Sequence, residues 1–210
     1  MIWTGGPPAQ RFKNSVRDLT IDCGEGNAGA VGLNFCANNQ GGVYDIVIRS
    51  GEKGDQPGAV GLGLDEQEVG PLLVKRVTII GFNLGIRVRH NVNSVTLEDI
   101  TLQGQRVAGI DNFNNYVFAR RVQSNNAVPA IVNAGQDGVI TLTDSQLTGT
   151  GKAAEIAAME NRHARATLYV RDVEVTGYAL AVKDEVAPAV SVGRIDEWVS
   201  GRGSTPFQAR

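Results

Sequence analysis

The chain has 210 residues and a formal net charge of −2, which suits one domain or a piece of one. With 42% hydrophobic and 20% charged residues, the chain can form a packed core and global disorder is excluded. The near-zero charge argues against nucleic acid as a partner, because an electrostatic binder needs a net basic surface. No apolar run approaches the roughly 20 residues that span a bilayer, so we expect no membrane partner either.

The two cysteines and the N-terminal segment narrow the class of protein further. Cys23 and Cys36 exclude a disulfide-rich scaffold and an all-cysteine metal cage. We expect both thiols to be free and buried, with a Cys23–Cys36 disulfide as the alternative. Residues 1–12 have neither the basic start nor the apolar stretch of a secretory signal.

A six-residue pattern recurs along the chain: apolar, any residue, Asp or Arg, apolar, any residue, apolar. Successive starts are 27, 31, 23, 22, 23 and 28 residues apart. The sixth copy is degraded, because a serine stands at its fourth position, where the pattern has an apolar residue. The copies begin at Val16, Val43, Val74, Leu97, Ala119, Leu142 and Val170.

A second, shorter strand is expected after each copy, where Gly or Ala precedes an apolar residue and allows a tight bend. The expected short strands are Gly32–Phe35, Gly61–Leu64, Gly85–Val88, Gly109–Asn112, Ala130–Asn133, Glu155–Ala158 and Leu180–Lys183. The alanine-rich segment Gly151–Arg162 is the best candidate for a short helix.

This period, with two short strands per repeat, predicts an all-β fold: a right-handed parallel β-helix of about seven coils, as a single domain over residues 1–210. A leucine-rich repeat would need a leucine–asparagine consensus that the sequence lacks. A β-sandwich would need two-residue hairpin turns, which are scarce here.

Stacking of the coils predicts which side chains lie in line, about 4.8 Å apart. One inward stack should hold Leu19, Ile46, Val77, Ile100, Val122 and Val173. The neighbouring outward column should hold Asp18, Asp45, Arg76, Asp99, Arg121, Asp144 and Asp172. Its charges alternate in the middle, which favours ion pairs that set the register over a substrate-binding strip.

The segment Asn14–Gly85 resembles the pectate-lyase superfamily, in the rhamnogalacturonase/epimerase-like group related to family 55 glycoside hydrolases. The resemblance rests on Val16-Arg-Asp-Leu-Thr-Ile-Asp22, Gly26-Asn-Ala-Gly-Ala-Val-Gly-Leu33, Ala37-Asn-Asn-Gln-Gly41, Gly70-Pro71 and Gly81-Phe82. It implies a protein that acts on an extracellular polysaccharide as a glycoside hydrolase or polysaccharide lyase, with no cofactor unless a lyase uses Ca²⁺.

The resemblance also implies that the full-length protein is secreted or periplasmic, and that this chain is the central part of it. No amphipathic cap helix precedes the first coil, and uncapped coil ends are where a second subunit would pair. The alternative is a non-catalytic glycan-binding or phage-tail-like structural module.

Familiar catalytic motifs are absent from the sequence, so site residues are proposed from their place in the repeat. Asp65 and Asp111 fall on one outward face two coils apart, about 9.6 Å on backbone spacing, close to the carboxyl separation of an inverting glycosidase. Arg89 and His90 could instead support β-elimination from a uronic acid. These four are the catalytic candidates; the substrate-binding candidates are Arg87, Asn112, Asn114 and Lys183, and no metal site is predicted.

Overall fold

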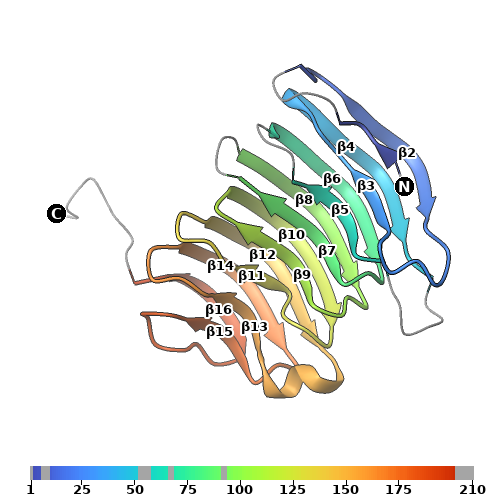
Figure 1. Ribbon diagram of the computed structural model, residues 1–210. Helices are drawn as coiled ribbons and strands as arrows, with labels where there is room; N and C mark the ends of the chain where they lie inside the picture. Colours follow the sequence, from blue (N-terminus) through green and yellow to red (C-terminus); the bar gives the residue numbers. More distant parts are fainter. Residues whose placement is uncertain (1, 6–9, 52–57, 66–68, 91–93, 202–210) are drawn as a thin grey trace.

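The strands alternate along the chain between two eight-stranded sheets that face each other (Figure 1). The computed structural model describes residues 2–5, 10–51, 58–65, 69–90 and 94–201. The short sheet contains β1 (Ile2–Trp3), β3 (Val31–Asn34), β5 (Val60–Leu64), β7 (Leu84–Arg89), β9 (Ala108–Phe113), β11 (Ile131–Asn133), β13 (Ala157–Asn161) and β15 (Leu180–Asp184). The long sheet contains β2 (Ser15–Asp22), β4 (Asn38–Arg49), β6 (Gly70–Ile80), β8 (Ser94–Gln103), β10 (Tyr116–Asn126), β12 (Val139–Gly149), β14 (Thr167–Thr176) and β16 (Gly193–Val199).

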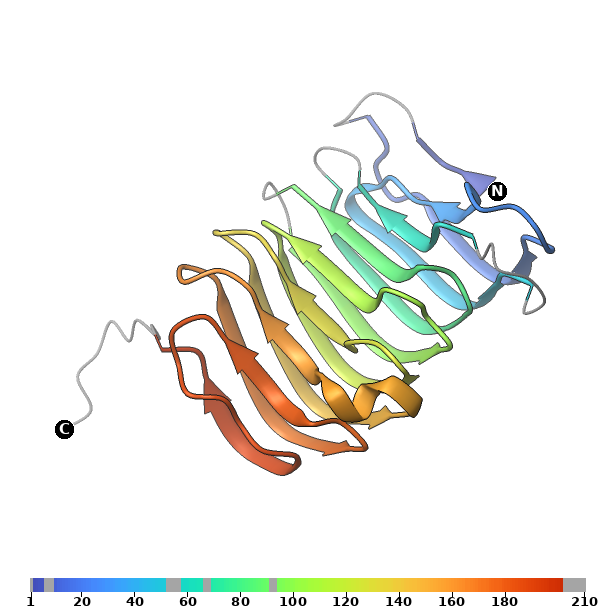
Figure 2. The ribbon, with the colours of Figure 1, turned by 60° about the horizontal axis from the view of Figure 1, so that its bottom comes forward.

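Pairing within both sheets is parallel until the last strand of the long sheet, so the fold is the predicted parallel β-helix. The register confirms the repeat alignment: Val16 pairs with Val43, and the same position continues through every later copy to Val170. β16 reverses direction and pairs antiparallel with β14. The coils therefore stack from the β2 end to the β16 end of the molecule (Figures 1 and 2).

The core lies between the two sheets and is almost wholly aliphatic. The predicted inward stack is confirmed from Ile46 to Val173, while Leu19 in the first coil is only partly buried. In the degraded sixth copy the stack is continued by Ser145, which the pattern left out. Its hydroxyl donates to the Thr143 carbonyl at 2.7 Å and accepts the Val122 N–H at 2.9 Å, so a polar atom fits an aliphatic column.

Each long strand bends at the third position of the repeat, where the backbone is left-handed. The seven residues there have φ between 51° and 58°, and five of them are aspartate, which tolerates this region better than most residues. Their side chains form the predicted ion pairs; Arg121, for example, donates from Nε to Asp99 Oδ1 at 2.5 Å. The bend explains why an outward charge recurs here. The seven residues at this bend are Asp18, Asp45, Arg76, Asp99, Arg121, Asp144 and Asp172.

Two predicted elements need correction in the sixth coil. The short strand is Ala157–Asn161, because Ile131 pairs with Met159, three residues beyond the position expected from Glu155–Ala158. The helical segment is a single 3₁₀ turn over Gly151–Glu155, seen at one edge of Figure 2, and the rest of the candidate helix is strand. Alanine favours helix locally, but burial between neighbouring strands decides the conformation of residues 157–161.

The prediction of two free, buried thiols is confirmed in part. Both cysteines are free; Cys36 is buried and Cys23 is half-buried. Burial raises the pKa of the Cys23 thiol. Over the ranges that the structure describes, no helix has the length and apolarity to cross a bilayer.

Candidate functional site

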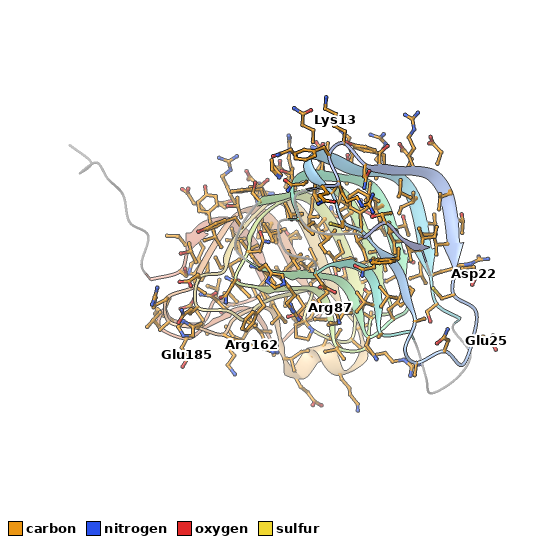
Figure 3. All side chains as sticks on the ribbon, turned by 45° about the horizontal axis from the view of Figure 1, so that its top comes forward. Lys13, Asp22, Glu25, Arg87, Arg162 and Glu185 are labelled. Carbon is orange, nitrogen blue, oxygen red and sulfur yellow. The ribbon has the colours of Figure 1, made fainter. Side chains whose placement is uncertain are left out.

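The outer face of the short sheet carries the predicted site residues. Because successive residues of a strand point to opposite faces, Arg87 and Arg89 point outward while Val88 points into the core. One outward column contains, in register, Gly63, Arg87, Asp111, Val132, Glu160 and Lys183. Arg89 and Phe113 pair in the next outward column. Figure 3 marks this side of the solenoid by the side chains of Arg87 and Arg162.

Asp65 follows β5 directly and leans back over Gly63. A Cβ added at Gly63 would lie 3.2 Å from Asp65 Oδ2, so the absence of a side chain there leaves room for the carboxylate. Arg87 binds the same oxygen, donating from Nε at 2.8 Å and also from Nη2. The ion pair and its hydrogen bonds raise the pKa of the Arg87 guanidinium. Asp65 Oδ1 is buried and has no hydrogen-bond partner among the described residues.

Asp111 forms the second ion pair of this face, with Arg89. Arg89 Nη2 donates to Asp111 Oδ2 at 2.5 Å, while Nη1 donates to the carbonyls of Val88 at 3.0 Å and Asp111 at 3.3 Å. The guanidinium also lies over the Phe113 ring, 5.8 Å from its centroid. Arg89 is therefore held by several contacts at once, on top of an aromatic ring.

The two aspartates lie on one face, but they do not lie in one column. The register puts Asp111 in line with Arg87 and Gly63, whereas Asp65 comes two residues after Gly63. Asp65, Arg87, Asp111 and Arg89 thus form a chain of alternating charges, with each carboxylate bound to an arginine. Neither aspartate is among the residues that line the hollow on this side of the solenoid.

The hollow on this side lies at the corner where the short sheet turns toward the long sheet. This corner pocket has a volume of about 470 Å³ and is lined by Arg89, His90, Phe113 and Asn114. His90 and Asn114 both have left-handed backbones, with φ of 68° and 63°, which turn the chain out of β7 and β9. Asn114 Oδ1 also accepts the Asp137 N–H at 3.1 Å, which holds the corner to the following loop.

Of the eight predicted residues, Arg89, His90 and Asn114 thus come together at the corner pocket. Arg87 is committed to Asp65, and exposed Lys183 lies three strands from Asp111, roughly 14 Å along the solenoid. Asn112 must be corrected as a substrate-binding residue. It is 0% exposed, and its amide donates to Asn133 Oδ1 at 3.0 Å and to the Asn115 carbonyl at 2.9 Å.

Two exposed aromatic side chains at and beyond this corner, Phe113 and Phe118, were missing from the predicted site. Phe113 is 47% exposed and forms the apolar wall of the pocket. Beyond the corner, β10 exposes Tyr116 and Phe118, which point outward two residues apart on the same strand. Alternation of aromatic with apolar residues in Tyr116–Ala119 was the available signal, because outward positions of a two-period strand are solvent-exposed.

The residues of this face do not suit a Ca²⁺ ion. No three His, Cys, Asp or Glu side chains gather as a metal site within the described ranges. Ca²⁺ takes six to eight oxygen ligands, whereas Asp65 and Asp111 lie apart and each already binds an arginine. The chemistry of this face is therefore that of arginine, histidine, amide and aromatic groups.

Comparison with known proteins assigns no family. No family model matches the chain, and no curated protein matches it.

Proposed function

We propose that this is a carbohydrate-active β-helix protein that binds an extracellular polysaccharide at the corner pocket. The supporting observation is the combination of a half-exposed Phe113 ring with Arg89, His90 and Asn114 around one hollow. An aromatic face packs against the apolar face of a sugar ring, while the surrounding polar groups hydrogen-bond its hydroxyl or carboxylate groups. The resemblance to the pectate-lyase superfamily supports the same class of ligand and a secreted full-length protein.

The ion pairs of this face favour binding of the polysaccharide over its hydrolysis. Phe113 is held in place by Arg89, so the platform exists before a ligand arrives and less ordering is needed on binding. Hydrolysis by Asp65 and Asp111 would require each carboxylate to exchange its arginine hydrogen bonds before giving or accepting a proton. Tyr116 and Phe118 extend the exposed aromatic surface around the corner and offer contacts to further sugar units.

Elimination is the second candidate activity, and His90 supports it. The imidazole is exposed and lines the pocket beside Arg89, and imidazole is the side chain that most often serves as a general base. In that scheme Arg89 neutralises a uronate carboxylate and His90 removes the proton from the carbon next to that carboxylate. A carbon–carbon double bond forms as the carbon–oxygen bond to the leaving sugar breaks, and the leaving oxygen takes a proton from water.

Native gel electrophoresis in gels that contain polygalacturonate or a neutral galactomannan tests the proposal. We expect one of these polymers to retard the protein, and Phe113→Ala to weaken the retardation by about tenfold. Phe12→Ala is the matched control, because Phe12 is equally exposed but lies at the N-terminal end. No retardation by either polymer, or equal retardation of the two variants, would overturn the proposal.

The same polymers, incubated with the protein, separate binding from catalysis. Reducing ends together with ultraviolet absorbance of unsaturated products mean elimination, and His90→Ala should abolish them. If reducing ends form without that absorbance, and are lost in Asp65→Ala or Asp111→Ala, the activity is hydrolysis by these aspartates. Retardation without either product identifies a binding protein.

A further inference from the structure

A groove crosses the outer face of the long sheet, past the left-handed bend and away from the corner pocket. It consists of three hollows of about 260, 210 and 510 Å³. The first two share Thr101, Gln123 and Gln146, and the last two share Gln103 and Asn125, so the hollows are continuous. The groove lies over β8, β10 and β12, three adjacent strands in the middle of the stack (Figure 1).

The floor of the groove lacks charge, although charges occur elsewhere in the same columns. The outward side chains there are Thr101, Gln103, Gln123, Asn125, Gln146 and Thr148. In the outermost coils the same columns carry Asp22, Arg49 and Glu174. Uncharged side chains also occupy these columns in neighbouring strands, for example Thr78 and Ile80. What distinguishes the floor is that four of its six outward side chains are primary amides, whereas the paired positions of β2, β4, β6 and β14 carry none.

The floor side chains are also free to bind a ligand. Within the described ranges, none of the six donates or accepts a side-chain hydrogen bond within the protein. The inward residues of the same strands differ: Asn126 Nδ2 donates to Ser124 Oγ at 2.8 Å and Asn126 Oδ1 accepts the Gln105 N–H at 2.7 Å. The outward amides consequently present both donors and acceptors to solvent in rows about 4.8 Å apart.

One wall of the groove is charged but internally neutralised. Arg121 donates to Asp99 and Glu98, and Arg120 Nε donates to Asp144 Oδ2 at 2.7 Å. These pairs hold the wall in place and leave it little net charge to attract an ion. At the other end the hollow is lined by the left-handed glycines Gly81 and Gly104 together with Arg106.

We propose that this groove is a second binding site, for a neutral polysaccharide segment that lies across the three coils. Primary amides and hydroxyls pair with sugar hydroxyls in both directions, whereas an anionic ligand would find no unpaired cation on the floor. The floor carries no aromatic ring, so each sugar unit binds weakly and the affinity comes from several units of one polymer. This goes beyond the function proposed for the corner pocket, because it lies on the other sheet.

Native electrophoresis in gels with galactomannan, soluble starch or mixed-linkage β-glucan tests the groove, with polygalacturonate alongside. In the Phe113→Ala background, which removes the aromatic platform, we expect at least one neutral polymer still to retard the protein. Adding Gln123→Ala and Gln146→Ala should abolish that remaining retardation. Thr20→Ala is the matched control, since Thr20 lies in the same column four coils before Gln123.

The proposed groove site would be overturned if the variant without both glutamines still bound a neutral polymer. It would also be overturned if no neutral polymer retarded Phe113→Ala. Gln123→Glu with Gln146→Glu is a second variant that keeps side-chain length, and it too should lose the neutral polymer. Circular dichroism checks that the surface variants remain folded. A change in oligomeric state of the glutamine variants, with unchanged retardation, would mean that the groove contacts a second copy and would also overturn the proposal.

Discussion

The side-chain amide of Asn133 donates to the side-chain oxygen of Asn161 at 3.0 Å, across one coil of the solenoid interior. Asn112 donates to Asn133 in the same way, and Asn161 Nδ2 donates to Asp184 Oδ2 at 2.7 Å. These side chains stand where the first coils have apolar residues such as Leu64 and Val88 in register. Each also caps the backbone of its own turn, so the ladder joins four coils through their corners.

Replacing the centre of this ladder should destabilise the protein strongly. Asn133 also donates to the carbonyls of Gly138 and Thr167, both at 3.1 Å. Asn133→Leu leaves these acceptors and Asn112 without their partner, at a cost of about 2–4 kcal/mol in the free energy of unfolding. Urea denaturation measures it. Asn125→Leu, at an outward position, should change stability by less than about 1 kcal/mol, and equal losses would contradict the ladder's role.

Asp144 lies at the left-handed bend of β12, with a φ of 51°, so substitutions there test the backbone strain of the bend. Asp144→Val places a β-branched side chain in this region and should cost about 1–2 kcal/mol. Asp144→Gly removes the strain and offsets loss of the exposed Arg120 pair, so stability should stay within about 0.5 kcal/mol. Thermal unfolding compares them. Thr141→Val, in the extended part of β12, is the control and should be neutral; a Val variant at 144 that is equally neutral would mean the bend is not strained.

The Arg87–Asp65 pair should matter more for stability than the Arg162–Glu160 pair on the same side of the solenoid. Its side chains are 31% and 20% exposed, and Arg87 supplies the hydrogen bonds of a carboxylate whose other oxygen is buried. Arg87→Ala should therefore cost about 1–3 kcal/mol. Arg162→Ala is the matched control, because the Arg162 side chain that binds Glu160 is 54% exposed and such pairs contribute about 1 kcal/mol or less. Urea denaturation that ranks the two equally would refute this order.

The fold could be predicted from the repeat, whereas the site depends on side-chain contacts and backbone angles that a sequence pattern does not show. Register followed from the sequence because a slip of one residue would turn Ile46 or Ile100 outward. The short strand of the sixth coil was misplaced because buried positions of this coil are held by Ser145 and by the alanines Ala157 and Ala158, which carry little hydrophobic signal. Asn112 was taken for a substrate-binding residue because its partner Asn133 lies 21 residues away and a single strand gives no sign of the ladder.

The side-chain geometry of the site was equally hidden from the sequence. Both Arg87 and Arg89 could be assigned to the outward face, but which of them binds Asp65 depends on how Asp65 folds over Gly63. The corner pocket needed the left-handed backbones of His90 and Asn114, which the sequence shows only as polar residues after a strand.

Acid should weaken the ion pairs at the bend of the long sheet. Arg121 lowers the pKa of the Asp99 carboxyl, and Lys75 followed by Arg121 lowers that of Glu98. A carboxyl whose pKa is lower in the folded state stabilises the fold above its unfolded value. That contribution is lost as pH falls from the ordinary carboxyl values near 4 through the lowered folded values. Stability should therefore drop as the solution is acidified through this window.

Arg121→Gln should make this acid-dependent loss shallower, because the pKa of Asp99 returns toward its ordinary value. Urea denaturation of the variant and the wild type between about pH 7 and pH 3 measures the difference in slope. Arg17→Gln is the matched control: its contact with Asp18 is 3.7 Å long between side chains that are 71% and 70% exposed. Added salt should reduce the Arg121 effect by screening these surface charges, and identical slopes for the two variants would show that the bend network does not contribute to acid stability.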